Sequence, residues 1–392
     1  MRSNRFHLFV QALTLVQISI CGWGWVFEQA HGQQPASDSP HPFEISGIRF
    51  EELGAQDRDV GKDSPWFGIA SKEAWREQEG KLRKRFDTLL GEMPQVGAPP
   101  GMRVVREENI EGVIRRRVVF EVEPGVSMDA YLLIPHSKQG EESSKRPGMI
   151  ALHPTTANNI DEIAGVGYEG ARATGLEFAK LGYVVVCPKC FLWQDAENFQ
   201  KAVEGHRDRH PNARGIAKMV FDARRAVDAL LAIPQVDPNR LVAVGHSLGA
   251  KEVLYLMAAD SRIVAGVASE GGVDLGSTNW EALWYLGPVP RLDPEWGHDE
   301  LVALIAPRAL LVMGGEQGPG AADGTQSLKN LRRSYPAWRS QGVPQEGSLK
   351  GAANQPSGLK KSGLWLWNHR SGHVFGPAQF ETASQWLHEV LQ

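Results

Sequence analysis

The sequence predicts an α/β fold in which a mostly parallel, doubly wound sheet follows several antiparallel strands. From about residue 171 onward, stretches with helical spacing alternate with short apolar runs such as Leu241-Val242-Ala243-Val244. Continuous apolar runs are typical of strands that helices cover on both faces of a parallel sheet. Residues 103–135 instead hold β-rich segments with no helical pattern between them, so we expect these strands to pair antiparallel. With 42% hydrophobic and 22% charged residues, the chain has the composition of a globular protein.

Each element follows from a local pattern. Charged and apolar residues mix at helical spacing over 66–90, and prolines soon afterwards end that segment. A polar loop is expected at 136–145, and residues 341–362, rich in Gly, Ser and Lys, are expected to form a surface insertion before the last strand. Early strands are expected at 103–106, 114–123, 128–135 and 149–152, and helix–strand pairs at 171–181 and 183–187, 216–233 and 241–245, 248–259 and 263–269, 298–305 and 309–313, and 328–339 and 364–367.

The first 32 residues have the features of a secretory signal peptide. Arg2 and Arg5 give a positive start, 6–27 contains no Asp, Glu, Lys or Arg, and Ala30-His31-Gly32 offers the small residues that signal peptidase needs. An uncleaved anchor is the alternative, although polar residues interrupt the apolar run. We therefore expect a periplasmic or secreted protein with no stable membrane association after cleavage. Its expected parts are a signal peptide at 1–32, a linker and helical extension at 33–100 and one large α/β domain at 101–392.

The charge balance argues against a nucleic-acid partner. The chain has 42 Lys and Arg residues against 46 Asp and Glu residues, a net charge of -4, and no long run of one sign. A protein that follows a phosphate backbone needs a basic patch or stripe. The oligomeric state cannot be inferred from the sequence.

One motif provides a candidate nucleophile. The apolar run at 241–244 continues directly into Gly245-His246-Ser247-Leu248-Gly249, and a helical pattern follows. This is the GxSxG pattern between a strand and a helix, in which a tight, strained turn exposes the serine at the carboxyl edge of the sheet. The helix N-terminus favours negative charge there, and the backbone N–H of Leu248 is a candidate oxyanion-hole donor. We therefore predict that Ser247 is a catalytic nucleophile rather than an ordinary turn serine.

A serine hydroxyl needs a general base, which in this architecture follows later in the chain. His373 lies in the loop after the last expected strand, at the position where such a base is expected. His369 lies closer to the strand end in the same loop. We predict that His373 is the base and that His369 is a structural histidine bonded to a neighbouring loop.

Three carboxylates could orient that base. Glu316 and Asp323 lie in the loop after the strand expected at 309–313, and Glu270 comes directly after the strand expected at 263–269. All three positions are at the carboxyl ends of strands near the expected nucleophile. Each could equally be a solvated loop carboxylate, so these residue positions leave the choice open.

A second oxyanion donor is expected after the strand at 149–152. The chain continues there as His153-Pro154-Thr155-Thr156. Because proline has no N–H group, Thr155 is the natural donor. We interpret His153 as a residue that shapes this loop.

A cysteine pair and a histidine pair could each have a structural or a functional role. Cys187 and Cys190 form a CxxC pair without a second pair to complete a zinc site, and a structural role is favoured over redox chemistry. An oxidising compartment would favour a disulfide between them. His206 and His210 have the i, i+4 spacing of a zinc site but lack the accompanying glutamate, so we interpret them as part of a polar loop and expect no metal.

Two further segments contain clustered aromatic or charged residues. Trp280, Trp284 and Tyr285 follow the strand at 263–269 and could line a substrate pocket by stacking on a sugar ring, or could pack a cap element onto the core. The charged positions of the helix expected at 216–233 are interpreted as a solvated face; they are Asp222, Arg224, Arg225 and Asp228.

Several segments together resemble a known family. The pieces GHSLGA, SEGG, NWEALWYLGP, APRALLVMGG, AADG and WNHRSGH are similar to those of the dienelactone hydrolase and acetyl xylan esterase-like branch of the α/β-hydrolase superfamily, over about residue 101 to the C-terminus. The resemblance implies an α/β-hydrolase fold with Asp323 as the acid and His373 as the base. Related glucuronoyl esterases place the acid in a segment similar to Ser269-Glu270-Gly271-Gly272, which keeps Glu270 as the alternative. A dienelactone hydrolase proper has a cysteine nucleophile, so Ser247 argues against dienelactone as substrate.

The resemblance also implies the reaction. We expect an exported serine esterase that needs no cofactor and cleaves a carboxylic ester through Ser247, His373 and Asp323. The implied substrate is a small-molecule or polysaccharide ester, such as acetylated or methyl-glucuronoylated xylan. Alternatives on the same fold are a glucuronoyl-esterase-like activity, a peptidase, which would be expected to carry a β-propeller-sized region, and a non-catalytic binding protein.

Overall fold

A computed structural model describes most of the chain from Gly68 onward. The described residues are 68–69, 71–94, 97–137, 144–194, 196–276, 278–288, 296–318, 320–322, 324–342 and 363–392. The chain divides into units at 1–39 and 40–392, and all described residues belong to the second. The expected signal peptide, most of the expected linker, most of the expected insertion at 341–362, and Asp323 lie outside the described residues. No helix in the described ranges is both long and apolar enough to cross a bilayer.

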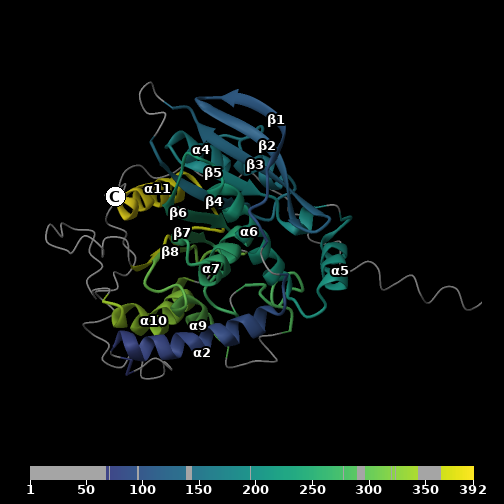
Figure 1. Ribbon diagram of the computed structural model, residues 1–392. Helices are drawn as coiled ribbons and strands as arrows, with labels where there is room; N and C mark the ends of the chain where they lie inside the picture. Colours follow the sequence, from purple (N-terminus) through teal and green to yellow (C-terminus); the bar gives the residue numbers. More distant parts are fainter. Residues whose placement is uncertain are drawn as a thin grey trace, which may run out of the picture. The chain divides into compact units, whose positions relative to one another are not determined.

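The described strands form one sheet in the order β1-β2-β3-β5-β4-β6-β7-β8-β9. The first three strands pair antiparallel, β3 pairs antiparallel with β5, and all later pairs are parallel. Figure 1 shows β1, β2 and β3 together at one end of the sheet. The expected fold class is confirmed. The strands are β1 (Arg103–Ile110), β2 (Val113–Glu123), β3 (Val126–Pro135), β4 (Arg146–Leu152), β5 (Val184–Pro188), β6 (Val236–His246), β7 (Ile263–Ser269), β8 (Ala309–Gly314) and β9 (Leu364–Asn368).

Helices cover both faces of this sheet. Neighbouring residues of one strand belong to different core clusters, since Val242 and Val244 pack on one face and Leu241 and Ala243 on the other. This alternation within a continuous apolar run explains why the strand shows no polar face in sequence. The helices are α2 (Lys72–Leu90), α3 (Asn159–Ile163), α4 (Thr174–Lys180), α5 (Phe199–Arg209), α6 (Gly215–Leu231), α7 (Leu248–Ala259), α9 (His298–Ala303), α10 (Gly324–Ser340) and α11 (Pro377–Leu391), with 3₁₀ turns η1 (Gly170–Ala173) and η2 (Phe191–Trp193).

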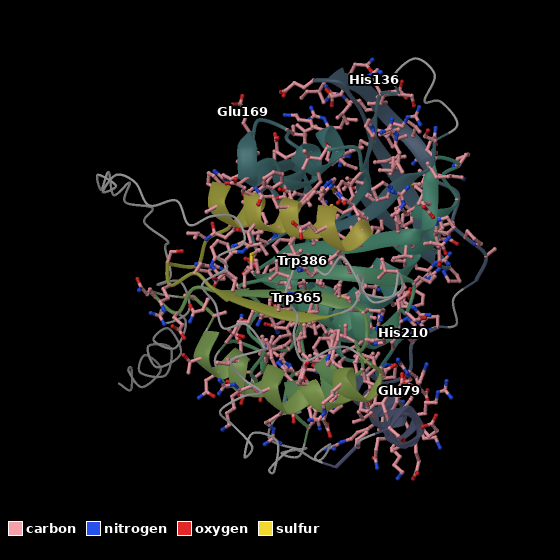
Figure 2. The ribbon with its side chains drawn as sticks, turned by 90° about the vertical axis from the view of Figure 1, so that its left-hand side faces the viewer. Glu79, His136, Glu169, His210, Trp365 and Trp386 are labelled. Carbon is pink, nitrogen blue, oxygen red and sulfur yellow. The ribbon has the colours of Figure 1, made fainter. Side chains whose placement is uncertain are left out.

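Two helices join distant parts of the sequence to this core. Phe86 of α2 stacks on Tyr255 of α7 with ring centroids 5.9 Å apart, so α2 packs on the face that also holds the helix after Ser247. Trp386 of α11 lies edge-on to Trp365 of β9 at 5.3 Å on the opposite face (Figure 2). Helices α3, α5 and α11 were not predicted from the sequence.

The expected solvated face of α6 is wrong. Asp222, Arg225 and Asp228 are 5–7% exposed. Arg225 donates to the carbonyl oxygens of Gly97 and Ala98 and pairs with Asp228 at 2.9 Å. The backbone of the segment before β1 therefore covers this side of the helix, which a helical-wheel pattern cannot reveal.

The expected pairing of the CxxC cysteines is also wrong. Cys187 and Cys190 are free and buried. Cys187 packs in one core cluster and Cys190 in the other, so the two thiols lie in different core layers. Burial raises the pKa of both thiols above the usual range, which makes them poor nucleophiles.

Buried charges link α6 to the sheet. Lys218 is 1% exposed, and its Nζ lies 2.6 Å from Glu123 Oε1 at the end of β2 and 2.5 Å from Asp222 Oδ1. Burial raises the pKa of Asp222, whereas Lys218 and His210 outweigh burial at Glu123 and lower its pKa. One buried ammonium group is thus shared between two buried carboxylates.

Removing this lysine tests the network. We expect Lys218→Met to reduce the free energy of unfolding by about 3–5 kcal/mol, because the buried Asp222 and Glu123 lose the cation that they share and Glu123 keeps, of its described partners, only His210 and Arg209. The matched control is Lys201→Met, whose pair with Glu204 is exposed, and it should cost less than about 1 kcal/mol. Urea unfolding of both variants measures the difference, and equal small losses would show that Lys218 does not hold the network.

Candidate active site

The predicted site residues meet at the carboxyl edge of the parallel strands. Hydrogen bonds of the parallel ladder continue past the strand ends: Ser247 N–H donates to Ser269 O at 2.8 Å, and Glu270 N–H donates to Met313 O at 2.9 Å. His369 N–H donates to Gly314 O at 2.9 Å. The backbone positions of Ser247, Glu270 and His369 are therefore fixed by the sheet itself.

The turn at Ser247 has the geometry that its motif predicts. Ser247 has φ 57° and ψ -114°, which is rare for a non-glycine residue and stores strain. A Cβ at Gly249 would lie 2.1 Å from Leu152 O, and one at Gly245 would lie 2.3 Å from the Gly249 backbone. Only glycine fits these close approaches. Because Leu248 is the first residue of α7, no intrahelical carbonyl can accept its N–H.

Glu270 lies between two histidines. Its Oε1 is 2.7 Å from His369 Nε2, its Oε2 is 3.6 Å from His373 Nδ1, and Ala322 N–H donates to Oε2 at 2.7 Å. The Glu270 side chain is 0% exposed. Burial alone would raise the pKa of Glu270, but the contacts with His369, His373 and the Ala322 N–H outweigh it and lower the pKa. The carboxylate is therefore an anion beside His373.

The histidine of the GxSxG motif packs against the expected base. The rings of His246 and His373 are 4.8 Å apart. Burial, and then the proximity of His373, lower the pKa of His246 to about 3. His246 is consequently neutral and apolar in character, while His373 retains a side-chain exposure of 27%. Within the described residues no hydrogen bond joins Ser247 Oγ to His373, and such contacts commonly tighten only when substrate binds.

The loop after β4 is held by His153. His153 is buried, its Nδ1–H donates to Pro154 O at 2.8 Å, and its Nε2 accepts the Cys190 N–H at 3.1 Å. Burial lowers its pKa to about 4, so the ring is neutral. His153 therefore shapes the loop that continues into Thr155, which is exposed beside it.

Other expected site residues lie elsewhere. The Glu316 carboxylate accepts the Thr325 N–H at 2.7 Å in the first turn of α10. Trp280 and Tyr285 are 0% and 2% exposed, so these two residues pack in the core and do not line an open substrate pocket. Trp284 is partly buried. The Lys251 ammonium lies 3.9 Å from the centre of the Trp280 ring. Sequence reasoning did not single out Lys251, although it lies one turn after the serine.

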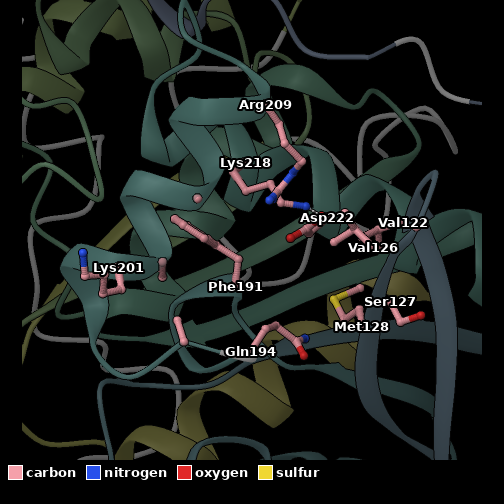
Figure 3. A pocket seen from close by; sticks show the side chains of 14 residues that line it. Val122, Val126, Ser127, Met128, Phe191, Gln194, Lys201, Arg209, Lys218 and Asp222 are labelled. Carbon is pink, nitrogen blue, oxygen red and sulfur yellow. Dashed lines mark hydrogen bonds and ion pairs between the residues drawn. The ribbon is translucent and has the colours of Figure 1, made fainter.

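A hollow lies on the same edge of the sheet, at the β2–β3 turn. Its volume is about 270 Å³, and Figure 3 shows Phe191, Gln194 and Arg209 among the side chains around it. Because Ala130 pairs with Pro188 at the end of β5, the start of β3 is at the carboxyl edge of the parallel strands. The adjacent turn η2 also places Trp193 edge-on to His153 at 4.9 Å, so η2 contacts both the hollow and the loop after β4.

The expected polar loop at His206 and His210 is wrong, because His206 is buried in α5 and His210 is the residue that caps this helix. His210 pairs with Glu123 at 2.6 Å, and His206 Nε2–H donates to Arg214 O at 3.2 Å. The described ranges contain no cluster of three or more His, Cys, Asp or Glu side chains that could hold a metal ion.

Comparisons with known proteins agree with this fold. Residues 136–282 match the model of the dienelactone hydrolase family. The chain is 23% identical over 242 residues to the "Putative hydrolase YtaP" of Bacillus subtilis (strain 168), covering 59% of this chain and 79% of that protein. A glucuronoyl esterase from Solibacter usitatus has a similar structure with a TM-score of 0.64 at 16% identity, over 83% of this chain and 95% of that one. A "putative acetyl xylan esterase" from Bacteroides fragilis NCTC 9343 gives a TM-score of 0.59 at 17% identity, over 82% and 89%.

Buried neutral histidines predict a pH dependence of stability. Burial lowers the pKa of His298 to about 3, and its ring packs edge-on to Trp280 at 4.4 Å. Below about pH 6.5 the unfolded chain binds a proton at this residue that the folded chain does not, so stability falls as pH falls. The loss reaches about 1.4 kcal/mol per pH unit for one such residue.

The measurement is urea unfolding at several pH values between 5 and 7.5. We expect His298→Phe to flatten the decline of stability by roughly that slope, because phenylalanine keeps the ring packing and binds no proton. The exposed His388 provides the control variant His388→Gln, which should retain the wild-type slope. An unchanged slope in His298→Phe would contradict the buried neutral state.

Proposed function

We propose that the chain is a serine hydrolase of the α/β-hydrolase superfamily that acts on carboxylic esters, and that its substrate is an ester carried by a carbohydrate. The observation that carries the proposal is the strained Ser247 at the start of α7, with Glu270 and His373 at the ends of the neighbouring strands. Ester hydrolysis needs a nucleophile, a base, an acid that orients the base, and donors for an oxyanion.

The reaction proceeds in two halves. Ser247 Oγ attacks the ester carbonyl carbon while His373 takes the hydroxyl proton, and the N–H groups of Leu248 and Thr155 face the oxygen that becomes negative. The intermediate collapses to an acyl-enzyme, and the departing alcohol oxygen takes the proton from His373. A water molecule then attacks the acyl carbon, giving its proton to His373. Release of the carboxylic acid returns that proton to Ser247.

Glu270 is our proposed acid. It contacts His373 from a buried position and is held by the Ala322 N–H, which fits a residue that orients an imidazole and stabilises the imidazolium. Asp323, which the family resemblance implies, remains a candidate because it lies outside the described residues. The Glu316 carboxylate is occupied at the start of α10, which argues against that alternative.

The substrate class rests on two observations. The similar structures include a glucuronoyl esterase and an acetyl xylan esterase, by their names. The hollow beside η2 lies on the catalytic edge and offers an aromatic ring, an amide and a guanidinium, groups suited to binding a sugar. Related glucuronoyl esterases place their acid in a segment similar to the one that contains Glu270. If Glu270 is the acid, a glucuronoyl ester is therefore favoured over an acetyl ester. We further propose that the protein acts outside the cytoplasm, as its N-terminal sequence predicts.

Replacing the nucleophile tests the proposal. We expect Ser247→Ala to lower kcat on any accepted ester by at least about 10⁴-fold while the fold persists, because the hydroxyl forms the covalent bond. Wild-type and variant are assayed on acetyl, feruloyl and methyl-glucuronoyl esters. The panel identifies the acyl group and the alcohol, and wild-type-like turnover by Ser247→Ala would favour a non-catalytic role for the motif.

Replacing each carboxylate identifies the acid. We expect Glu270→Gln to lower kcat by about 10²–10⁴-fold, because the amide neither stabilises the imidazolium nor fixes its tautomer. Asp323→Asn and Glu316→Gln are the matched variants and should keep most of kcat. The assay uses one activated ester and separates kcat from KM. A large kcat loss confined to Asp323→Asn would show that Asp323, and not Glu270, is the acid of the triad.

A further inference from the structure

We propose that His369 is a positioning residue that holds the Glu270 carboxylate in the orientation needed by His373. The inference rests on the proposed function and adds a fourth residue to its site. His369 is close enough to compete for the role of base, but its side chain is 2% exposed against 27% for His373. A base must reach the substrate, so the buried imidazole acts through another residue.

The tautomer of His369 is set by Ser371. Ser371 N–H faces His369 Nδ1 at 3.4 Å, and Ser371 Oγ lies 2.6 Å from the same nitrogen. A backbone N–H can only donate, so Nδ1 is the acceptor and the ring proton is on Nε2. That nitrogen lies 2.7 Å from Glu270 Oε1. His369 therefore carries its ring proton on Nε2, which is in close contact with one oxygen of the carboxylate but is not aligned with it as a hydrogen bond.

The other oxygen of the Glu270 carboxylate, Oε2, is left to contact the proposed base His373. The Ala322 N–H holds Oε2 at 2.7 Å, and His373 Nδ1 lies 3.6 Å from the same atom. The Ala322 N–H fixes Oε2 by a hydrogen bond, and the His369 ring in contact with Oε1 keeps the carboxylate from turning. His369 thus keeps Oε1 in place, while Oε2 faces His373.

The backbone keeps His369 at this distance. His369 N–H donates to Gly314 O, and the loop crosses directly over Gly315. A Cβ at Gly315 would lie 2.4 Å from Ser371 O and 2.9 Å from Glu270 Oε1. The glycine thus allows the histidine loop and the carboxylate to approach each other. The ring of Trp367 lies edge-on to His369 at 5.4 Å.

The pH dependence follows from the groups that face Glu270. Within the described residues these are His246 from β6 and His369 and His373 from the loop after β9. After burial, the contact with His369 has the largest effect on the Glu270 pKa, and it lowers that pKa. Without His369 the carboxylate binds a proton more readily, so activity is lost at a higher pH as the solution is acidified.

The test compares two substitutions of His369. Leucine has a similar bulk and no N–H, whereas the glutamine amide offers an N–H group to Oε1. On the best ester of the panel we expect His369→Leu to lower kcat by about 10–100-fold with little change in KM, and to move the acidic limb of the kcat profile to higher pH. His369→Gln should restore most of kcat and the wild-type limb. Thermal unfolding checks that both variants are folded.

A double variant separates positioning from a general structural effect. In the Glu270→Gln background, His369→Leu should cause no further loss of kcat, because the carboxylate that it orients is already gone. An additive loss would overturn the proposal, as would His369→Leu with wild-type kcat and pH profile. Ser371→Ala, which removes one donor to Nδ1, should give a smaller loss than His369→Leu, and a larger one would contradict the assigned tautomer.

The failure of the proposed function has a different signature. In that case wild-type protein cleaves none of the esters and Ser247 is not labelled by a fluorophosphonate, which would overturn the function and this inference together. Wild-type activity with an insensitive His369 would overturn the inference alone.

Discussion

The catalytic edge depends on the parallel hydrogen-bond ladder, which continues beyond the ends of β6, β7 and β9. The N–H groups of Ser247, Glu270 and His369 each donate to a carbonyl at the end of an adjacent strand. Residues that follow a strand usually belong to mobile loops, but here their backbone is part of the sheet. The sheet therefore determines the spacing between the proposed nucleophile Ser247, the proposed acid Glu270 and His369, as a preorganised site requires.

The backbone strain at Ser247 and Glu270 is compatible with a position fixed by the sheet. Ser247 and Glu270 both have positive φ, 57° and 62°. Such conformations cost about 1–3 kcal/mol each and persist only when the surroundings fix them. The ladder bonds, the helix that starts at Leu248, and the close packing around Gly245 and Gly249 supply that constraint. The side chains are thus turned out of the sheet at the two strand ends that the reaction needs.

The sequence predicted the parts of the site that depend on local patterns. The small residues around Ser247 and the apolar run before it specify a tight turn between strand and helix, and such spacing is visible in one dimension. The sheet order, and therefore which strand ends are neighbours, depends on long-range pairing. Glu270, Glu316 and Asp323 could not be ranked from spacing because their distances to His373 depend on that pairing.

The same limit explains the predictions that failed. The charges of α6 suggest a solvated face, yet backbone carbonyls of Gly97 and Ala98, more than a hundred residues earlier, cover Arg225. The spacing of Cys187 and Cys190 permits a disulfide, but the thiols pack in different core layers. Aromatic residues after β7 suit a sugar site as well as a core, and only burial distinguishes the two for Trp280 and Tyr285.

The electrostatic design of the site follows from one anion among three imidazoles. Glu270 is the negative charge, and His246 stays neutral because burial lowers its pKa to about 3. The Ser371 N–H donates to Nδ1 of His369, which leaves the ring proton on the nitrogen that faces Glu270. Only His373 combines contact with the carboxylate and exposure to a substrate. In the proposed reaction, a proton taken from Ser247 is therefore stabilised on His373, while His369 holds the Glu270 carboxylate in place.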